Sequence, residues 1–198
     1  GVQWMSAGKG VTHSERPAAN IASEGGEFEI IQFWVNTPSQ FKMDKAIYIP
    51  LQNTDIPGKH FEGQQSQYSV ICGNFMELEG PVKAKQDLLI LNIDLKPDET
   101  VEIEVPEYMN CCIYSLDGQI ELNGTSVNDN KSLVHFNNEG TVIKLTASKI
   151  SRLLLLAGQP INEEVVSYGP FVMNSTTEIL TAIKDAQMGK MGILIEEF

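Results

Sequence analysis

The sequence predicts an all-β fold, an antiparallel sandwich or barrel with one short helix near its C-terminal end. Three observations support this prediction: short segments in which apolar and polar residues alternate, tight-turn dipeptides between some of them, and one segment with the apolar period of a helix. Short strands at regular turn spacing are typical of antiparallel sandwiches and barrels rather than of parallel α/β sheets.

The first part of the chain contains a strand signal and a loop signal. Glu27–Val35 is rich in Phe, Ile and Trp, which favours a strand. Asn53–Gln67 contains Pro, Gly and several Gln residues, so it is predicted as a loop. Gly80–Pro81 marks a hinge between two β units, which we expect at residues 1–83 and 84–198.

The second part of the chain carries the stronger strand signals. Apolar residues alternate with polar ones in Asp87–Leu95 and in Thr100–Val105. The dipeptides Asp117–Gly118 and Asn123–Gly124 favour the positive φ angles of tight turns, so each predicts a β-hairpin. Further strands are expected at Cys111–Leu116, Gln119–Leu122, Lys131–Phe136, Thr141–Leu145 and Arg152–Ala157.

A helix is predicted after residue 175. Ser175 and Glu178 have the spacing of a capping box, in which the two side chains satisfy free amides of the first helical turn. Gly189 and Gly192 are expected to end the helix. One apolar stripe follows the capping box at helical spacing: Ile179, Ala182, Ile183 and Ala186.

The composition excludes several classes of protein. Fourteen Lys and Arg residues face 26 Asp and Glu residues, a net charge of −12, which argues against direct binding to nucleic acid. The longest apolar run has the length of a strand, so we expect no membrane span. Of the three cysteines, Cys111 and Cys112 are neighbours and are poorly placed to bond to each other. Reduced thiols, and an opening segment that is not a charged-then-apolar leader, favour a cytoplasmic protein.

The tetrapeptide Thr12–Glu15 holds the candidate metal ligands. If this segment is a strand, His13 and Glu15 lie on the same face. An imidazole and a carboxylate together suit a divalent metal such as Fe, Mn, Cu, Ni or Zn. The alternative is an ordinary surface or core-edge pair, because a metal centre needs about three or four protein donors. His60 is expected in a solvated loop, and His135 is expected in a strand as an edge or core histidine rather than as a ligand.

Four motifs, in order along the chain, resemble those of the pirin family, the two-domain members of the cupin superfamily. Val2–Glu15 is similar to the family's second metal-ligand strand, and Gln32–Pro38 to the strand that ends in an Asn-x-Pro turn. Arg152–Pro160 and Val165–Asn174 are similar to its C-terminal signature. The resemblance covers almost the entire chain.

The resemblance implies two stacked cupin-type β-barrels, with a metal in the N-terminal barrel only. In the family that metal, Fe or another divalent transition metal, is held by three His and one Glu. Two of these ligands map onto His13 and Glu15, whereas the other two come from an H-x-H strand that has no counterpart here, since no His precedes His13. We therefore expect the first barrel to be incomplete and to be covered by a second copy, in a homo-oligomer.

Three functions remain open from the sequence. The first is a quercetinase-like dioxygenase acting on a flavonol-like small molecule, in which Glu15 is both a metal ligand and the catalytic group that takes a proton from the substrate hydroxyl. The second is a non-enzymatic regulator that acts through a protein partner, for which the acidic charge favours a basic protein surface. The third is a degenerate paralogue that keeps the fold and binds no metal.

Overall fold

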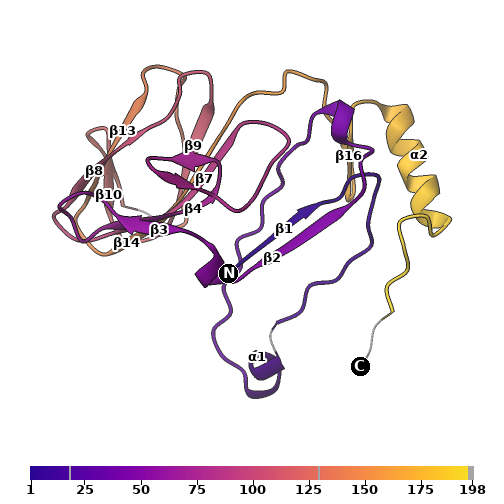
Figure 1. Cartoon of the computed structure of the whole chain (residues 1–198), viewed down its shortest axis with the longest axis horizontal. Helices are drawn as coiled ribbons and strands as arrows, with labels where there is room; N and C mark the ends of the chain where they lie inside the picture. Colours follow the sequence, from indigo (N-terminus) through magenta and orange to yellow (C-terminus); the bar gives the residue numbers. More distant parts are fainter. Residues whose placement is uncertain (18, 129, 196–198) are drawn as a thin grey trace. The chain divides into compact units, whose positions relative to one another are not determined.

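The computed structural model describes residues 1–17, 19–128 and 130–195 of the chain (Figure 1). It confirms the all-β prediction: within these residues strands predominate, and every ladder between neighbouring strands for which a register is defined is antiparallel. None of the helices in the described residues is long and apolar enough to cross a membrane.

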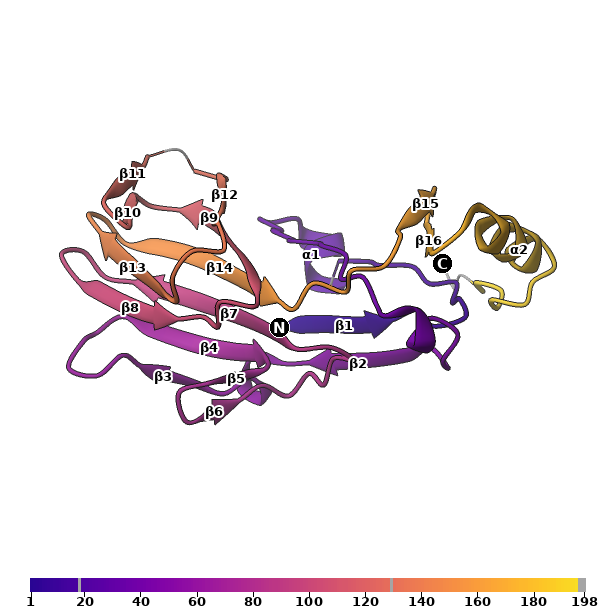
Figure 2. The same cartoon turned by 90° about the horizontal axis from the view of Figure 1, so that it is seen from above.

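Two sheets form a sandwich (Figure 2). The six-stranded sheet has the order β12 (Leu133–His135), β9 (Asn110–Asp117), β14 (Ser151–Gly158), β7 (Leu88–Leu95), β4 (Gln67–Cys72) and β3 (Gly58–His60). The four-stranded sheet has the order β11 (Thr125–Val127), β10 (Ile120–Leu122), β13 (Val142–Ala147) and β8 (Thr100–Glu104).

The remaining elements are short. Three two-stranded sheets pair β1 (Val2–Ser6) with β2 (Ile47–Leu51), β5 (Asn74–Phe75) with β6 (Leu78–Glu79), and β15 (Val166–Tyr168) with β16 (Phe171–Met173). The helices are α1 (Ala19–Glu24), α2 (Thr176–Gln187) and the 3-10 turns Ser39–Phe41 and Asn53–Asp55.

Residue contacts group the chain into two compact units. The first joins Gly1–Trp4 to Tyr48–Ile161 and contains both sheets of the sandwich; the second joins Met5–Ile47 to the segment that begins at Asn162. These units are defined by contacts and not by continuity in sequence, so the division into residues 1–83 and 84–198 stays a prediction.

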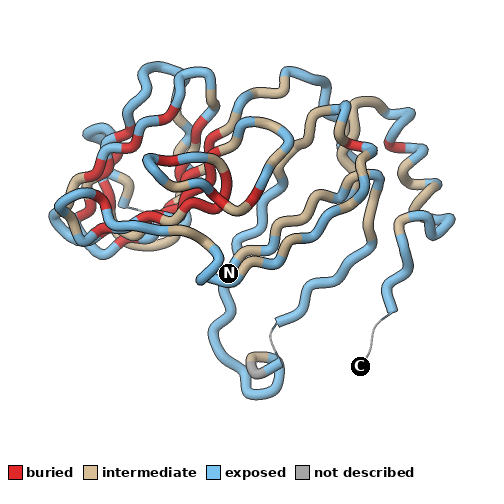
Figure 3. Tube along the Cα trace, viewed as in Figure 1, coloured by how far each residue is buried: buried red, intermediate tan, exposed pale blue. Residues whose placement is uncertain are grey.

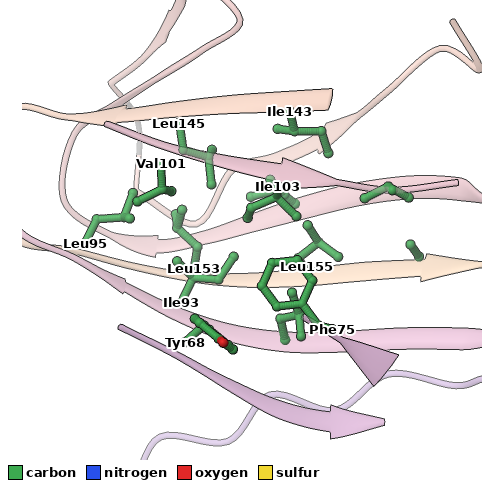
Figure 4. Close-up of a cluster of buried hydrophobic side chains, with 14 of the residues drawn as sticks. Tyr68, Phe75, Ile93, Leu95, Val101, Ile103, Ile143, Leu145, Leu153 and Leu155 are labelled. Carbon is green, nitrogen blue, oxygen red and sulfur yellow. The ribbon is translucent and has the colours of Figure 1, made fainter. Parts of the chain in front are cut away.

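The core lies between the two sheets of the first unit (Figures 3 and 4). The rings of Tyr68 and Phe75 meet edge to face there, with centroids 5.0 Å apart. Among the described residues of the second unit, only Lys42 and Ile179 are buried side chains. The second unit therefore has almost no apolar core of its own within the described residues.

The run of four leucines at residues 153–156 lies on β14, and it is continuous because both faces of the sheet are covered there. Leu153 and Leu155 point into the core between the sheets, whereas Leu154 belongs to a smaller cluster with Ile71, Cys72, Val82 and Ile90. A strand covered on both faces has no solvent-facing parity, so its sequence is continuously apolar instead of alternating.

The helix prediction is confirmed, with one difference in the cap. The Ser175 hydroxyl accepts from the Glu178 amide at 3.3 Å, and Gly189 follows the helix with a φ of +73°. The Glu178 carboxylate accepts from the amide of Asn174, one residue before the N-cap, at 3.0 Å. Together these two hydrogen bonds satisfy the backbone amides of Glu178 and Asn174 at the start of the helix.

Two turn and loop predictions are wrong in part. Asn123–Gly124 does close the β10–β11 hairpin, with positive φ at both residues. Asp117–Gly118 does not close a hairpin, because β9 and β10 belong to different sheets. Gly118 is required there because a Cβ would collide with Ser151. The predicted loop Asn53–Gln67 includes the edge strand β3, whose exposed residues give no apolar pattern.

The strand predicted at Glu27–Val35 is also wrong. Residues 25–38 have no helix or strand assigned, and no strand of the described chain pairs with them. A strand is stable only where another strand takes up its backbone hydrogen bonds, so strand-like composition alone does not produce one.

Candidate metal-ligand residues

His13 and Glu15 lie in a segment held at Thr12 and otherwise free of regular structure. Residues 11–17 form no strand, so the shared strand face expected for His13 and Glu15 is not formed. The Thr12 amide donates to the Met191 carbonyl at 2.8 Å, and the Thr12 hydroxyl to the Gly192 carbonyl at 3.2 Å. These two bonds fix the segment one residue before His13, and they replace the strand ladder that the sequence led us to expect.

Both candidate ligands are exposed and weakly engaged. The Gln32 amide nitrogen lies 3.4 and 3.3 Å from the two carboxylate oxygens of Glu15, which makes long, weak hydrogen bonds. No described residue bonds to the His13 ring. An accessible imidazole and an accessible carboxylate two residues apart are therefore available to a cation; we call them the ligand pair.

The ligand pair is too small to be a metal centre by itself. Within residues 1–17, 19–128 and 130–195 there is no group of three or more His, Cys, Asp or Glu side chains that could hold a metal ion. His60 is exposed on β3, with its Nδ1 3.0 Å from the Gln65 carbonyl, and His135 is exposed on β12. The donor types fit a divalent transition metal, but the described residues supply two donors where about three or four are needed.

Glu163 joins two distant parts of the second unit, and sequence reasoning missed it. Its carboxylate accepts from the Ser39 amide at 2.8 Å, the Ser39 hydroxyl at 2.9 Å and the Asn174 side chain at 3.1 Å. Hydrogen bonds from Ser39, the backbone amide first, lower the pKa of Glu163. The available signal was that Glu163 lies just before one family-like motif, Val165–Asn174, and Ser39 just after another, Gln32–Pro38; the bonds between Ser39 and Glu163 bring these two motifs together.

Lys42 extends this polar network. Its side chain is 7% exposed and its ammonium donates to the Asn36 amide oxygen at 2.6 Å. Burial lowers the pKa of Lys42, and the charges of Glu163 and Glu178 oppose that shift. A buried ammonium with one strong acceptor and two nearby carboxylates is a structural feature that orders the segment after Asn36.

The second unit also presents an exposed apolar segment, Glu27–Val35. Its large apolar side chains are 39–65% exposed: Phe28, Ile30, Ile31, Phe33 and Trp34. Gln32, which contacts Glu15, belongs to the same segment. We call Glu27–Val35 the apolar segment.

Comparisons with known proteins agree with the motifs. The pirin family model matches residues 1–35, and the model of the pirin C-terminal cupin domain matches residues 90–192, slightly more than half of the chain. A pirin-like protein of Solanum lycopersicum is 36% identical over 194 residues, which cover 96% of this chain and 64% of that protein. Pirin-like protein 2 of Arabidopsis thaliana is 35% identical over 205 residues, which cover 100% of this chain and 61% of that protein.

The fold agrees with a solved structure. A crystal structure of quercetin 2,3-dioxygenase from Acinetobacter baumannii matches with a TM-score of 0.92 and 34% identity, over 98% of this chain and 67% of that one. This match confirms the predicted cupin-type fold, and the chain spans about two thirds of the length of these relatives. On its sequence, its strands and these matches, the chain belongs to the pirin family of cupin proteins.

Proposed function

We propose that the ligand pair supplies two donors to a divalent transition-metal centre of a quercetinase-like dioxygenase, and that the other donors do not come from the described residues of the same copy of the chain. The observation that carries this proposal is the exposed imidazole of His13, two residues before the exposed and weakly bonded carboxylate of Glu15. The crystallised Acinetobacter relative is named a quercetin 2,3-dioxygenase, which supports a flavonol-like substrate for the completed centre.

Fe or another metal of similar preference fits this donor pair, because imidazole nitrogen and carboxylate oxygen are ligands of borderline divalent ions. A second copy of the chain would add its own His13 and Glu15 and so bring the donor number to about four, as such centres need. In that arrangement Glu15 would hold its place through Gln32, and its carboxylate would be the group nearest a substrate hydroxyl. Free thiols at Cys72, Cys111 and Cys112 support a cytoplasmic setting.

The test is elemental analysis of the purified chain after anaerobic loading with Fe²⁺ and removal of free metal. We expect about one half of a metal ion per chain if two copies share a centre, and about one if each chain holds its own. His13→Ala should abolish binding, whereas His60→Ala, which removes an equally exposed imidazole on β3, should leave it unchanged. Background metal in the wild-type chain would overturn the proposal and leave the degenerate, metal-free reading.

A second function, docking of another protein chain, is supported by the apolar segment. Five large apolar side chains exposed within nine residues are unusual for a protein surface, and extended backbone without a ladder is a template for strand pairing. The proposed occupant is a second copy, which covers the segment in a homodimer and also makes the shared metal centre feasible.

Sedimentation or light scattering tests the dimer. We expect the wild-type chain to be dimeric at micromolar concentration and Trp34→Ser to shift it toward monomer, because Trp34 is 65% exposed in the segment. Leu133→Ser is the matched control, since Leu133 is 64% exposed but lies on β12. A wild-type monomer would overturn the dimer, and binding of a different, basic protein to the same segment would assign the regulator function instead.

A further inference from the structure

A second site lies in the first unit, at one end of the sandwich. A cleft of about 440 Å³ opens where β4 ends, β7 begins and β8 ends, and we call it the barrel-end cleft. Its volume is within the range of small-molecule sites. All of its lining residues fall between 72 and 109, so it shares no residue with the ligand pair.

The floor of the barrel-end cleft is apolar. Cys72, Val82 and Leu89 are buried there, and Leu88 and Met109 are half-buried beside them. Burial raises the pKa of the Cys72 thiol, so this residue presents a neutral surface. The floor can therefore take an apolar body but offers no charge to hold one.

The rim of the cleft is acidic and contains an aromatic ring. Asp87 lies just before β7, in the connection to the six-stranded sheet, and Glu104 is the last residue of β8 in the four-stranded sheet. Tyr108 is 53% exposed, and its hydroxyl is 3.5 Å from Asp87 Oδ2, too far for a strong hydrogen bond. The rim thus places two carboxylates and an aromatic ring around one opening.

These rim charges are not balanced by the other groups that line the cleft. Lys83 is the one cation among the described lining residues, and its ammonium lies 2.5 Å from the Glu79 carboxylate. That pair is neutral as a unit, so Asp87 and Glu104 leave the cleft with an excess of negative charge. Anionic ligands are repelled by this charge, whereas an ammonium group is attracted both to the carboxylates and to the face of Tyr108.

We infer that the barrel-end cleft binds a small organic cation, an amine whose apolar body rests on the floor while its ammonium lies between Asp87 and Glu104. A bare metal ion does not fit this site, because the described residues contain no group of three donors that could hold one. The inference goes beyond the proposed dioxygenase function and does not depend on it.

The test uses three probes of nearly equal size that differ in charge: 2-phenylethylamine as the cation, 2-phenylethanol as the neutral analogue and 3-phenylpropanoate as the anion. Binding to the full chain is followed by nitrogen-15 amide shifts. We expect saturable binding of the amine, with shifts at residues such as Asn74, Leu89 and Met109 that line the cleft. The neutral probe should bind about fivefold more weakly, and the anion more weakly still.

Two variants and a control locate the charge. Glu104→Gln should weaken amine binding about fivefold and leave binding of the neutral probe unchanged. Asp87→Asn provides a second, independent reading should one variant fold poorly. Glu102→Gln is the matched control, because Glu102 is exposed on the same face of β8 but does not line the cleft. Equal binding of all three probes, or equal weakening by Glu102→Gln, would overturn the inference.

Discussion

Truncation of Leu155 to alanine should be among the most damaging single changes in this fold. Leu155 lies in the middle of β14 and is 0% exposed. Its register partners are Ile113 on β9 and Leu91 on β7, which are also 0% exposed. Because hydrogen-bonded strands fix the backbone on both sides, neighbouring side chains have little freedom to fill the space that the truncation leaves.

The position in the sheet sets the expected magnitude. Leu→Ala changes in rigid cores cost about 3–5 kcal/mol, with the larger values where the cavity stays open, so we expect about 4 kcal/mol for Leu155→Ala. Leu154→Ala should cost about 3 kcal/mol, because Leu154 is buried in a smaller cluster rimmed by half-buried residues. Leu156→Ala should cost about 1–2 kcal/mol, since Leu156 is only half-buried.

Urea unfolding followed by far-UV circular dichroism measures these differences. The transition midpoint should fall in the order Leu156→Ala, Leu154→Ala, Leu155→Ala, with the slope of free energy against urea unchanged. The melting temperature of Leu155→Ala should be lower than that of the wild-type chain by roughly 10–20 °C, by the relation between unfolding free energy and melting temperature for a domain of this size. A cost for Leu155→Ala no larger than that for Leu156→Ala would refute the reasoning that burial between two paired strands governs the loss.

Three further changes test other features of the fold. Hydrogen bonds from the loop before β4, first from the Gln65 amide, lower the pKa of Glu99. Glu99 therefore stabilises the fold at pH values above the ordinary Glu pKa, and this contribution is lost as the pH falls through the lowered pKa. Glu99→Gln should accordingly make the free energy of unfolding depend less steeply on pH in the acid range. Ser175→Ala should lower the stability of the unit that contains α2 by about 1 kcal/mol through loss of the N-cap, measured by thermal melting; no change would argue against the cap. Burial raises the pKa of Cys111 to about 12 and also raises that of Cys112, so a thiol reagent at pH 8 should label these two only after denaturation.

Several strands of the sandwich were predictable from their own residues. A strand buried on one face alternates apolar and polar residues with a period of two. Thr100–Val105 was expected and β8 occupies Thr100–Glu104, with Val101 and Ile103 buried and the intervening glutamates exposed. The run at Arg152–Ala157 was also expected and became β14, but there the signal was a short continuous apolar run, because both faces of that strand are covered. In both cases the information lies within the segment itself, in side chains that must face the core.

Pairing partners were not predictable, because they depend on residues far away in sequence. Asp117–Gly118 has the composition of a hairpin turn, but β9 leaves one sheet and β10 joins the other. Turn chemistry specifies a local backbone angle and not which strand the chain pairs with afterwards. The same holds for the hydrogen bonds from Ser39 to Glu163, because these two residues are 124 positions apart in sequence and no local pattern predicts that they meet.

The ligand pair was singled out first by its residue types and spacing, and the family resemblance then assigned both residues to a metal centre; the spacing alone would have misled about their geometry. A shared face for His13 and Glu15 requires a strand, and the segment has none in the structure. The absence of a strand around His13 and the shortage of metal donors both concern the second unit, in which Lys42 and Ile179 are the only buried residues among those described. The sequence therefore names two candidate donors, whose role as metal ligands stays a prediction, whereas their geometry depends on what packs against that unit.

The hydrogen bonds from Gln32 to Glu15 connect the apolar segment to the ligand pair. Alternate residues of an extended segment point to opposite faces, so a strand that pairs with Glu27–Val35 would fix the direction of Gln32 as well as cover Phe33 and Trp34. Ordering Gln32 would in turn hold the Glu15 carboxylate in one place, which favours metal binding by lowering the entropy lost when the ion is captured. Assembly and metal binding are then linked, and each should strengthen the other by the same factor. Added metal should therefore raise the dimer fraction of the wild-type chain but not that of His13→Ala.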